Sequence, residues 1–161
     1  MHFGNLQRTV LVGILSSILL VASLFVPWFE LADTAERRNQ EAWICGTGDL
    51  SCTGWETFPI GRWLFIAAAA APVILAYFIV RAQKGKYPTG EFTMTVGFIV
   101  IVLVVFNGIL DKPGDSIDQI GISLTTGYWM ALGAGVLMSA AGAFRSVEQG
   151  GGAGRRPPGT F

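Results

Sequence analysis

Two cysteines separated by six residues are the clearest chemical feature of this chain. Cys45 and Cys52 enclose GTGDLS, whose two glycines favour a tight turn. Outside a cytoplasmic membrane, thiols tend to oxidise to disulfides. The spacing therefore predicts a structural disulfide between Cys45 and Cys52, with a redox-active pair as the alternative. A four-helix thiol oxidase relays electrons between two cysteine pairs, and this sequence holds only one.

Other residues that could do chemistry are scarce. The single histidine, His2, and the absence of HxxxH and CxxC patterns leave almost no ligands for a metal or haem. No catalytic constellation is present, so we expect no cofactor and no enzymatic activity. The formal net charge is +0, which gives no reason to expect binding to nucleic acid.

Four long apolar runs must position these residues. They cover residues 9–28, 63–80, 92–110 and 127–144, and each is about as long as a helix that crosses a ~30 Å hydrocarbon core. Only 14% of the residues are charged, against roughly 25% in soluble domains. The third run is rich in β-branched residues, but in lipid only a helix satisfies its own backbone. The sequence therefore predicts an all-α membrane fold, a four-transmembrane-helix bundle.

The first run follows Arg8, so a cleaved signal peptide is an alternative for it. Its length and the lack of a clean A-x-A site favour an uncleaved span.

The distribution of basic residues predicts the orientation of this bundle. Loops 29–62 and 111–126 fall on one side, and the positive-inside rule places the more basic side in the cytoplasm. We therefore expect a bacterial cytoplasmic membrane protein with both termini in the cytoplasm. The four-helix domain would cover residues 1–145, and the Gly/Pro-rich tail 146–161 would be disordered. The first loop would be extracytoplasmic and closed by the disulfide. The expected cytoplasmic basic residues are Arg8, Arg81, Lys84, Lys86, Arg145, Arg155 and Arg156, against Arg37, Arg38, Arg62 and Lys112 outside.

Aromatic residues near the ends of the runs are typical of side chains that anchor a protein at the membrane–water interface. The expected anchors are Trp28, Trp43, Trp55, Trp63, Tyr128 and Trp129.

Polar and small residues inside the runs indicate how the helices pack. No predicted span contains a charged residue or a histidine, and Asn107 is the strongest polar residue. We expect Asn107 to bond across helices or to a loop near the outer interface, with a role in permeation as the alternative. A stripe of small residues recurs every four positions in the fourth run, which favours close helix approach within the bundle or against another subunit. The stripe consists of Ala131, Gly135, Ser139 and Ala143.

Three segments together resemble a family of uncharacterised actinobacterial-type four-helix (tetraspan) membrane proteins. They are SLFVPWFE, GWETF and GISLTTGYWMALGAGVLMSAAGAFRS, and the resemblance spans most of residues 10–146. It implies a fold and a topology but no activity. The first loop is also similar to that of claudin-type tetraspans through Trp28, Trp43, Cys45 and Cys52. It is shorter, however, and lacks the Gly-Leu before the second tryptophan.

The functional expectation is a non-enzymatic accessory or scaffold subunit of a larger cell-envelope complex. Its partners would be membrane lipid and other membrane protein subunits. One alternative is a small transporter or channel subunit. Another is a thiol-redox sensor or oxidoreductase that uses Cys45 and Cys52.

Overall fold

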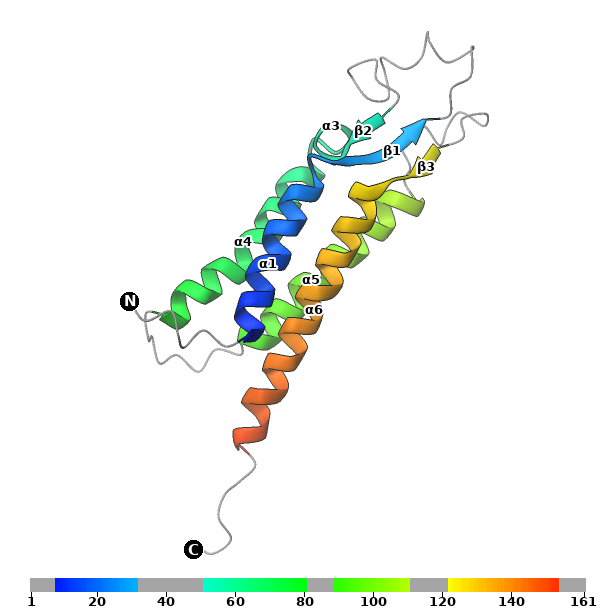
Figure 1. The fold of residues 1–161 in the computed structure, drawn as a ribbon. Helices are drawn as coiled ribbons and strands as arrows, with labels where there is room; N and C mark the ends of the chain where they lie inside the picture. Colours follow the sequence, from blue (N-terminus) through cyan, green and yellow to red (C-terminus); the bar gives the residue numbers. More distant parts are fainter. Residues whose placement is uncertain (1–7, 32–50, 81–88, 111–121, 154–161) are drawn as a thin grey trace, which may run out of the picture.

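The computed structural model describes residues 8–31, 51–80, 89–110 and 122–153 (Figure 1). The described chain is mostly helical, with three short strands. The elements in chain order are α1 (Arg8–Ser23), β1 (Pro27–Leu31), β2 (Ser51–Thr53), α3 (Gly54–Thr57), α4 (Gly61–Val80), α5 (Thr89–Val105), the π-helical turn η3 (Phe106–Leu110), β3 (Ile122–Leu124) and α6 (Thr126–Ala153).

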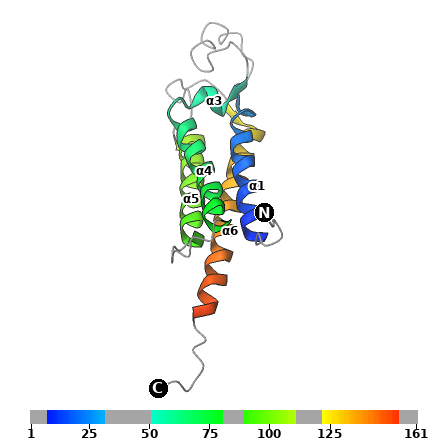
Figure 2. The same ribbon diagram turned by 90° about the vertical axis from the view of Figure 1, so that its left-hand side faces the viewer.

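Four long helices run side by side in alternating directions, and the strands lie together at one end of them (Figures 1 and 2). We call this the sheet end. At the opposite, distal end, α1 and α5 begin and α4 ends. α6 continues beyond the other helices at the distal end. α5 packs most extensively on α6, and α1 packs on both α6 and α4.

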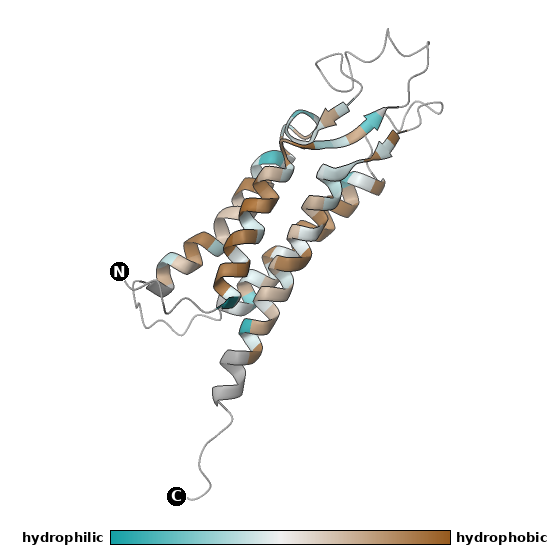
Figure 3. Cartoon of the chain, viewed as in Figure 1, coloured by the Kyte–Doolittle hydropathy of each residue, from teal (hydrophilic) through white to brown (hydrophobic). Residues whose placement is uncertain are grey.

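Among the described residues, three helices are long and apolar enough to cross a membrane: Gly61–Phe78, Gly90–Ile109 and Thr126–Val147. α1 is apolar but has 16 residues, about 24 Å at the helical rise. Hydrophobic residues occur along all four helices (Figure 3), and many of their large apolar side chains are exposed, a surface suited to lipid. These features are compatible with a multi-pass membrane protein. The exposed side chains include Leu15, Ile18, Val73, Phe78, Phe98, Val102, Val136 and Phe144.

The first helix ends earlier than the predicted limit at residue 28. After Ser23, the next three N–H groups donate to carbonyls three residues back, so the chain tightens before it leaves the helix. Pro27 then disfavours a helical conformation at Val26. The chain continues as strand β1, which the sequence analysis did not predict.

Strand β1 is the centre of a three-stranded antiparallel sheet of order β2-β1-β3. Pro27 pairs with Thr53 and Phe29 pairs with Cys52, so Trp28 is an extra residue in a bulge. A bulge lets neighbouring side chains escape the strict alternation of a strand. Trp28 and Phe29 are consecutive and both fully buried, which a regular strand over one core would not allow.

Helices α5 and α6 approach each other at backbone distance. A Cβ added to Gly97 would lie 2.5 Å from the backbone nitrogen of Ser139. Gly142 of α6 faces the backbone at Met94 just as closely. Small residues permit this approach, which stabilises helix pairs in lipid through dispersion contacts.

Two further expectations differ from the structure. Asn107 lies in the π-helical turn η3, and its Nδ2 donates to Leu103 O at 2.7 Å. The predicted bond across helices or to a loop is therefore wrong for this donor, which bonds one turn back in its own helix. The fourth helix also extends further than the predicted limit at residue 144, since α6 ends at Ala153 and includes residues 146–153 of the expected tail.

Candidate functional site

The sheet end is built around Trp28. Its indole Nε1 donates to Ser23 O at 2.7 Å, which satisfies a carbonyl at the end of α1. Its ring packs against Phe58, Phe65 and Tyr128, with centroids 5.5, 5.6 and 6.2 Å away. Trp28 therefore links α1, α4 and α6 through one buried side chain.

Two glycines make room for this ring. A Cβ at Gly54 would lie 2.7 Å from Trp28 Nε1, and one at Gly127 would lie 2.5 Å from Trp28 Cδ1. Gly54 opens α3 and Gly127 lies in the first turn of α6. The ring is thus held between two helix starts, and neither position accepts a larger residue without a shift.

The sheet is fastened to the helices by backbone bonds on both sides of Trp28. Trp55 N donates to Leu24 O at 2.9 Å, and Thr125 N donates to Trp28 O at 2.9 Å. Helix α3 is closed by a capping box between Thr53 and Glu56, which satisfies two N–H groups at its start. The described strands and α3 at the sheet end are therefore attached to the long helices by backbone hydrogen bonds.

Beside this buried core lies an exposed group that we call the aromatic patch, made of Phe25, Trp55, Ile60, Arg62 and Trp63. Trp55 stacks on Phe25 at 5.3 Å and tilts against Trp63 at 6.2 Å. The Arg62 guanidinium lies 4.8 Å from the Trp55 ring centroid and 5.8 Å from that of Trp63. Phe25 is 61% and Trp63 59% exposed, so the patch presents aromatic rings to the surroundings, with the half-buried Arg62 beside them.

The predicted interfacial anchors separate into two groups. Trp63 and Trp129 are exposed and Trp55 is half-buried, as an anchor requires. Trp28 and Tyr128 are instead buried against each other, so neither ring lies at the protein surface, where an interfacial anchor was expected. The β1 bulge and the glycine contacts turn Trp28 inward, and neither is visible in the hydropathy pattern. Trp43 lies outside the described residues.

The cysteine pair is only partly described. Cys52 is fully buried in the core under the sheet, opposite Phe29. Cys45 lies outside the described residues, so the pairing of the two stays a prediction.

The small-residue stripe of α6 lies against α5. Ala131 is fully buried, and a Cβ at Gly135 would meet the side chains of Ile101 and Val100 at 3.0 and 3.1 Å. Ser139 contacts Gly97, and Ala143 is half-buried. At Gly135 and Ser139, the stripe packs inside this chain.

A different face of α6 borders an open apolar groove beside α1. Leu19, Trp129, Met130, Gly133 and Val136 line it. Gly133 has nothing within 4 Å of an added Cβ. Gly133, which is not part of the stripe, is half-buried and has open space beside it at this groove.

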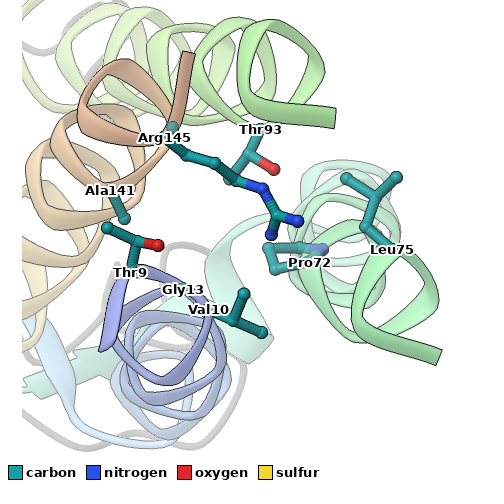
Figure 4. A pocket seen from close by; sticks show the side chains of 9 residues that line it. Thr9, Val10, Gly13, Pro72, Leu75, Thr93, Ala141 and Arg145 are labelled. Carbon is teal, nitrogen blue, oxygen red and sulfur yellow. The ribbon is translucent and has the colours of Figure 1, made fainter. Parts of the chain in front are cut away.

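The distal end contains a residue that the sequence analysis placed outside the membrane. Arg145 was expected among the cytoplasmic basic residues after the fourth apolar run, yet it lies inside α6 and is only 9% exposed. Its side chain reaches into a small cavity between α1, α4, α5 and α6 (Figure 4). The available signal was that the helical pattern of α6 continues past Phe144 without a helix-breaking proline.

Within the described ranges, no three His, Cys, Asp or Glu side chains come together to hold a metal ion. No family model, curated protein or solved structure matches the chain.

Proposed function

We propose that this chain is a non-enzymatic integral membrane subunit that supports a larger complex of the bacterial cell envelope. The observation that carries the proposal is the aromatic patch, which is exposed yet fixed to a rigid base. Tryptophan and arginine are the residues most enriched among binding hot spots. Preordered rings also lose little conformational freedom on binding. The patch is therefore a suitable contact surface for another membrane protein subunit.

Segment 32–50 extends this surface in the proposal. Its two ends are fixed on neighbouring strands, where Glu30 pairs with Ser51. The sequence between them holds Trp43 and Cys45. In the proposal, Cys45 forms a disulfide with Cys52.

The proposal includes four membrane spans, with α1 as the fourth. α1 packs on α4 and α6, and it exposes Leu11, Leu15 and Ile18. Its helix is shorter than a ~30 Å core. The buried aromatic side chains around Trp28, which follow the end of α1, would supply the rest of the apolar thickness.

The proposed orientation places the sheet end outside and the distal end in the cytoplasm. The positive-inside rule supports this, because Arg8, Arg81, Lys84 and Lys86 belong to the start of α1 or to the α4–α5 connection. Membership of the actinobacterial-type tetraspan family is part of the same proposal and rests on the sequence motifs.

The test is purification of the full chain from its native membrane in mild detergent, followed by native mass spectrometry. We expect a complex of defined stoichiometry. Changing Trp55 and Trp63 together to Ala should release the other subunit while the chain stays monodisperse. The matched control changes Leu15 and Ile18, exposed on α1, to Ala and should keep the complex. A wild-type chain that purifies only alone, or a patch variant that keeps its companion, contradicts the proposal.

A small transporter or channel subunit is the second candidate, and the position of Arg145 is the observation that favours it. Charged residues buried among membrane helices often mark ion or substrate pathways. The cavity at Arg145 has a free volume of only about 10 Å³, however, enough for a single water. Solute flux into liposomes that contain the purified chain, abolished by Arg145→Gln, would favour this candidate over the accessory subunit.

A further inference from the structure

One long side of α4 is left open by the part of the chain that the structure describes. α4 packs on α1 and, less extensively, on α5, and it lies at the edge of the bundle beside α1 (Figure 1). Only 22% of its span Gly61–Phe78 is buried, against 28% and 39% for the spans in α5 and α6. Its buried residues recur along one side of the helix and include Phe65, Ala69, Pro72 and Ala76. The opposite side is therefore open to lipid or to another protein.

The open side of α4 has the spacing of a surface that packs against a second helix. Its residues follow one another at alternating intervals of three and four positions, which keeps a row of side chains in line with a neighbouring helix. Large side chains, 52% or more exposed, lie at both ends of the row. Two alanines between them leave room for a close approach. We call this row the α4 seam, and it consists of Ile60, Trp63, Ala67, Ala70, Ile74 and Tyr77.

The α4 seam and the aromatic patch form one continuous surface, because Ile60 and Trp63 belong to both. Arg62 lies at their junction, with its guanidinium over the rings of Trp55 and Trp63. The rings hold the guanidinium in place, yet most of its five N–H groups are unused within the described residues. Nη1 donates one long bond to Trp55 O at 3.5 Å, and Nε is buried without a hydrogen-bond partner.

Arg62 also has no acidic partner among the residues that the structure describes. The nearest acid along the sequence, Glu56, bonds to Thr53 in the capping box of α3. Since the span begins at Gly61, Arg62 lies at the edge of the apolar region, where an unpaired charge is costly. A carboxylate fits the planar fork of a guanidinium through two parallel hydrogen bonds. The surface is therefore complementary to an apolar helix that carries an acidic residue at the sheet end.

We propose that the α4 seam binds a transmembrane helix of the companion subunit, and that an Asp or Glu of that subunit pairs with Arg62. This inference rests on the proposed function and names the kind of partner that it requires. A second copy of the chain fits the seam less well. Copies in one membrane have the same orientation, so a two-fold contact between two α4 helices would place both Arg62 charges at the same end, where they repel each other.

The first experiment tests the seam in the complex purified from the native membrane in mild detergent, by native mass spectrometry. Ala67→Phe places a ring in the middle of the seam and should lower retention of the companion subunit about tenfold, because the helices can no longer approach closely. Val102→Phe places the same ring at an exposed position of α5 and should leave retention unchanged. The isolated Ala67→Phe chain should keep the melting temperature of the wild type, because Ala67 is exposed.

The second experiment tests the charge at the end of the seam. Arg62→Gln should weaken retention of the companion about tenfold, the effect of losing a hydrogen-bonded charge pair. Arg62→Lys keeps the charge and supplies an amine, which a carbodiimide joins to an adjacent carboxylate as an amide with loss of water. We expect mass spectrometry of the digested product to find this amide between position 62 and an Asp or Glu of the companion. The wild-type complex, treated in the same way, is the control and should give no amide at this position.

The other results would overturn the inference. If the complex survives Ala67→Phe or Arg62→Gln, α4 does not bind the companion as proposed, while the double change of Trp55 and Trp63 still tests the proposed function. A companion with the mass of this chain would identify a second copy. If Arg62→Gln releases a phospholipid but not the companion, Arg62 binds a lipid phosphate. A wild-type chain that purifies alone would refute the proposed function and this inference together.

Discussion

Arg62 at the sheet end and Arg145 at the distal end have opposite surroundings. Arg62 is half-buried and lies over the rings of Trp55 and Trp63, beside the exposed face of Trp63. Arg145 is nine-tenths buried among four helices. The contrast extends to the packing around each. The sheet end is held by large rings around Trp28, and the α5–α6 contact toward the distal end is held by backbone against backbone. Truncation should therefore damage the first region, and enlargement should damage the second.

The largest effect should come from truncation at the sheet end. Trp28→Ala removes a fully buried ring and the bond from Nε1 to Ser23 O. A buried Trp→Ala change typically costs about 3–5 kcal/mol of the free energy of unfolding. The measurement is unfolding of the purified chain by SDS titration. Trp63→Ala, at an exposed tryptophan, is the matched control and should cost far less. Equal losses would remove the distinction between the buried ring and the patch.

Loss of the predicted disulfide should cause the next largest loss of stability, again at the sheet end. A Cys45–Cys52 bond closes a ring of about eight residues and should contribute roughly 2–3 kcal/mol on the chain-entropy account. Replacing both cysteines with Ser should lower the melting temperature without preventing membrane insertion. Intact-protein mass spectrometry after thiol alkylation, without reductant, checks the bond directly. Alkylation of both residues in the native protein would rule out the disulfide.

The converse test enlarges a residue where helices touch. Gly97→Ala would place a Cβ 2.5 Å from Ser139 N, so α5 and α6 must move apart. Overpacking of this kind costs about 1–3 kcal/mol. Gly133→Ala is the same change on the open face of α6 and should cause no loss. Thermal unfolding of the two variants in parallel measures the difference, and comparable melting temperatures would show that backbone contact is not what holds α5 to α6.

Gly135 gives a second measure of the same contact. Gly135→Leu pushes a large side chain toward Ile101 and should lower the melting temperature of the isolated chain. Val136→Leu, one residue further on an exposed position, should have little effect. If Gly135→Leu leaves the isolated chain stable but abolishes binding of a companion subunit, the stripe lies at an interface between subunits and not within this chain.

The smallest effect concerns the coupling of Arg62 to the patch. A double-mutant cycle with Arg62→Gln and Trp55→Leu should give an interaction energy of about 0.5–1 kcal/mol, the range for an exposed cation–π pair. The same cycle between Arg62 and Phe144, which lies toward the distal end, should give none. Equal coupling in the two cycles would mean that Arg62 acts through the whole fold and not through the indole ring.

The sequence by itself determined the helical frame. Apolar runs long enough to span lipid must be helical, because no other single-segment conformation satisfies the backbone there. The positions of α4, α5 and α6 followed from hydropathy, with differences at their ends. The sequence also predicted that another helix approaches closely at Gly135, because small residues at helical spacing favour such contacts. It did not predict which helix makes the contact.

Only the tertiary structure decided which side chains are buried at each end of the bundle and which residues they contact. The strands are three to five residues long, and Phe29 finds Cys52 and Leu124 as partners from distant parts of the chain. Such pairings leave little local pattern. The sequence predicts that Trp28 is an interfacial anchor. In the structure a bulge in β1 turns its ring inward, between Gly54 and Gly127. From the sequence Arg145 is a cytoplasmic basic residue at the end of the fourth run, but in the structure α6 continues past it and residues of three other helices surround its side chain. Whether a side chain is buried depends on neighbours from distant parts of the chain. The hydropathy of the sequence does not show which residues these neighbours are.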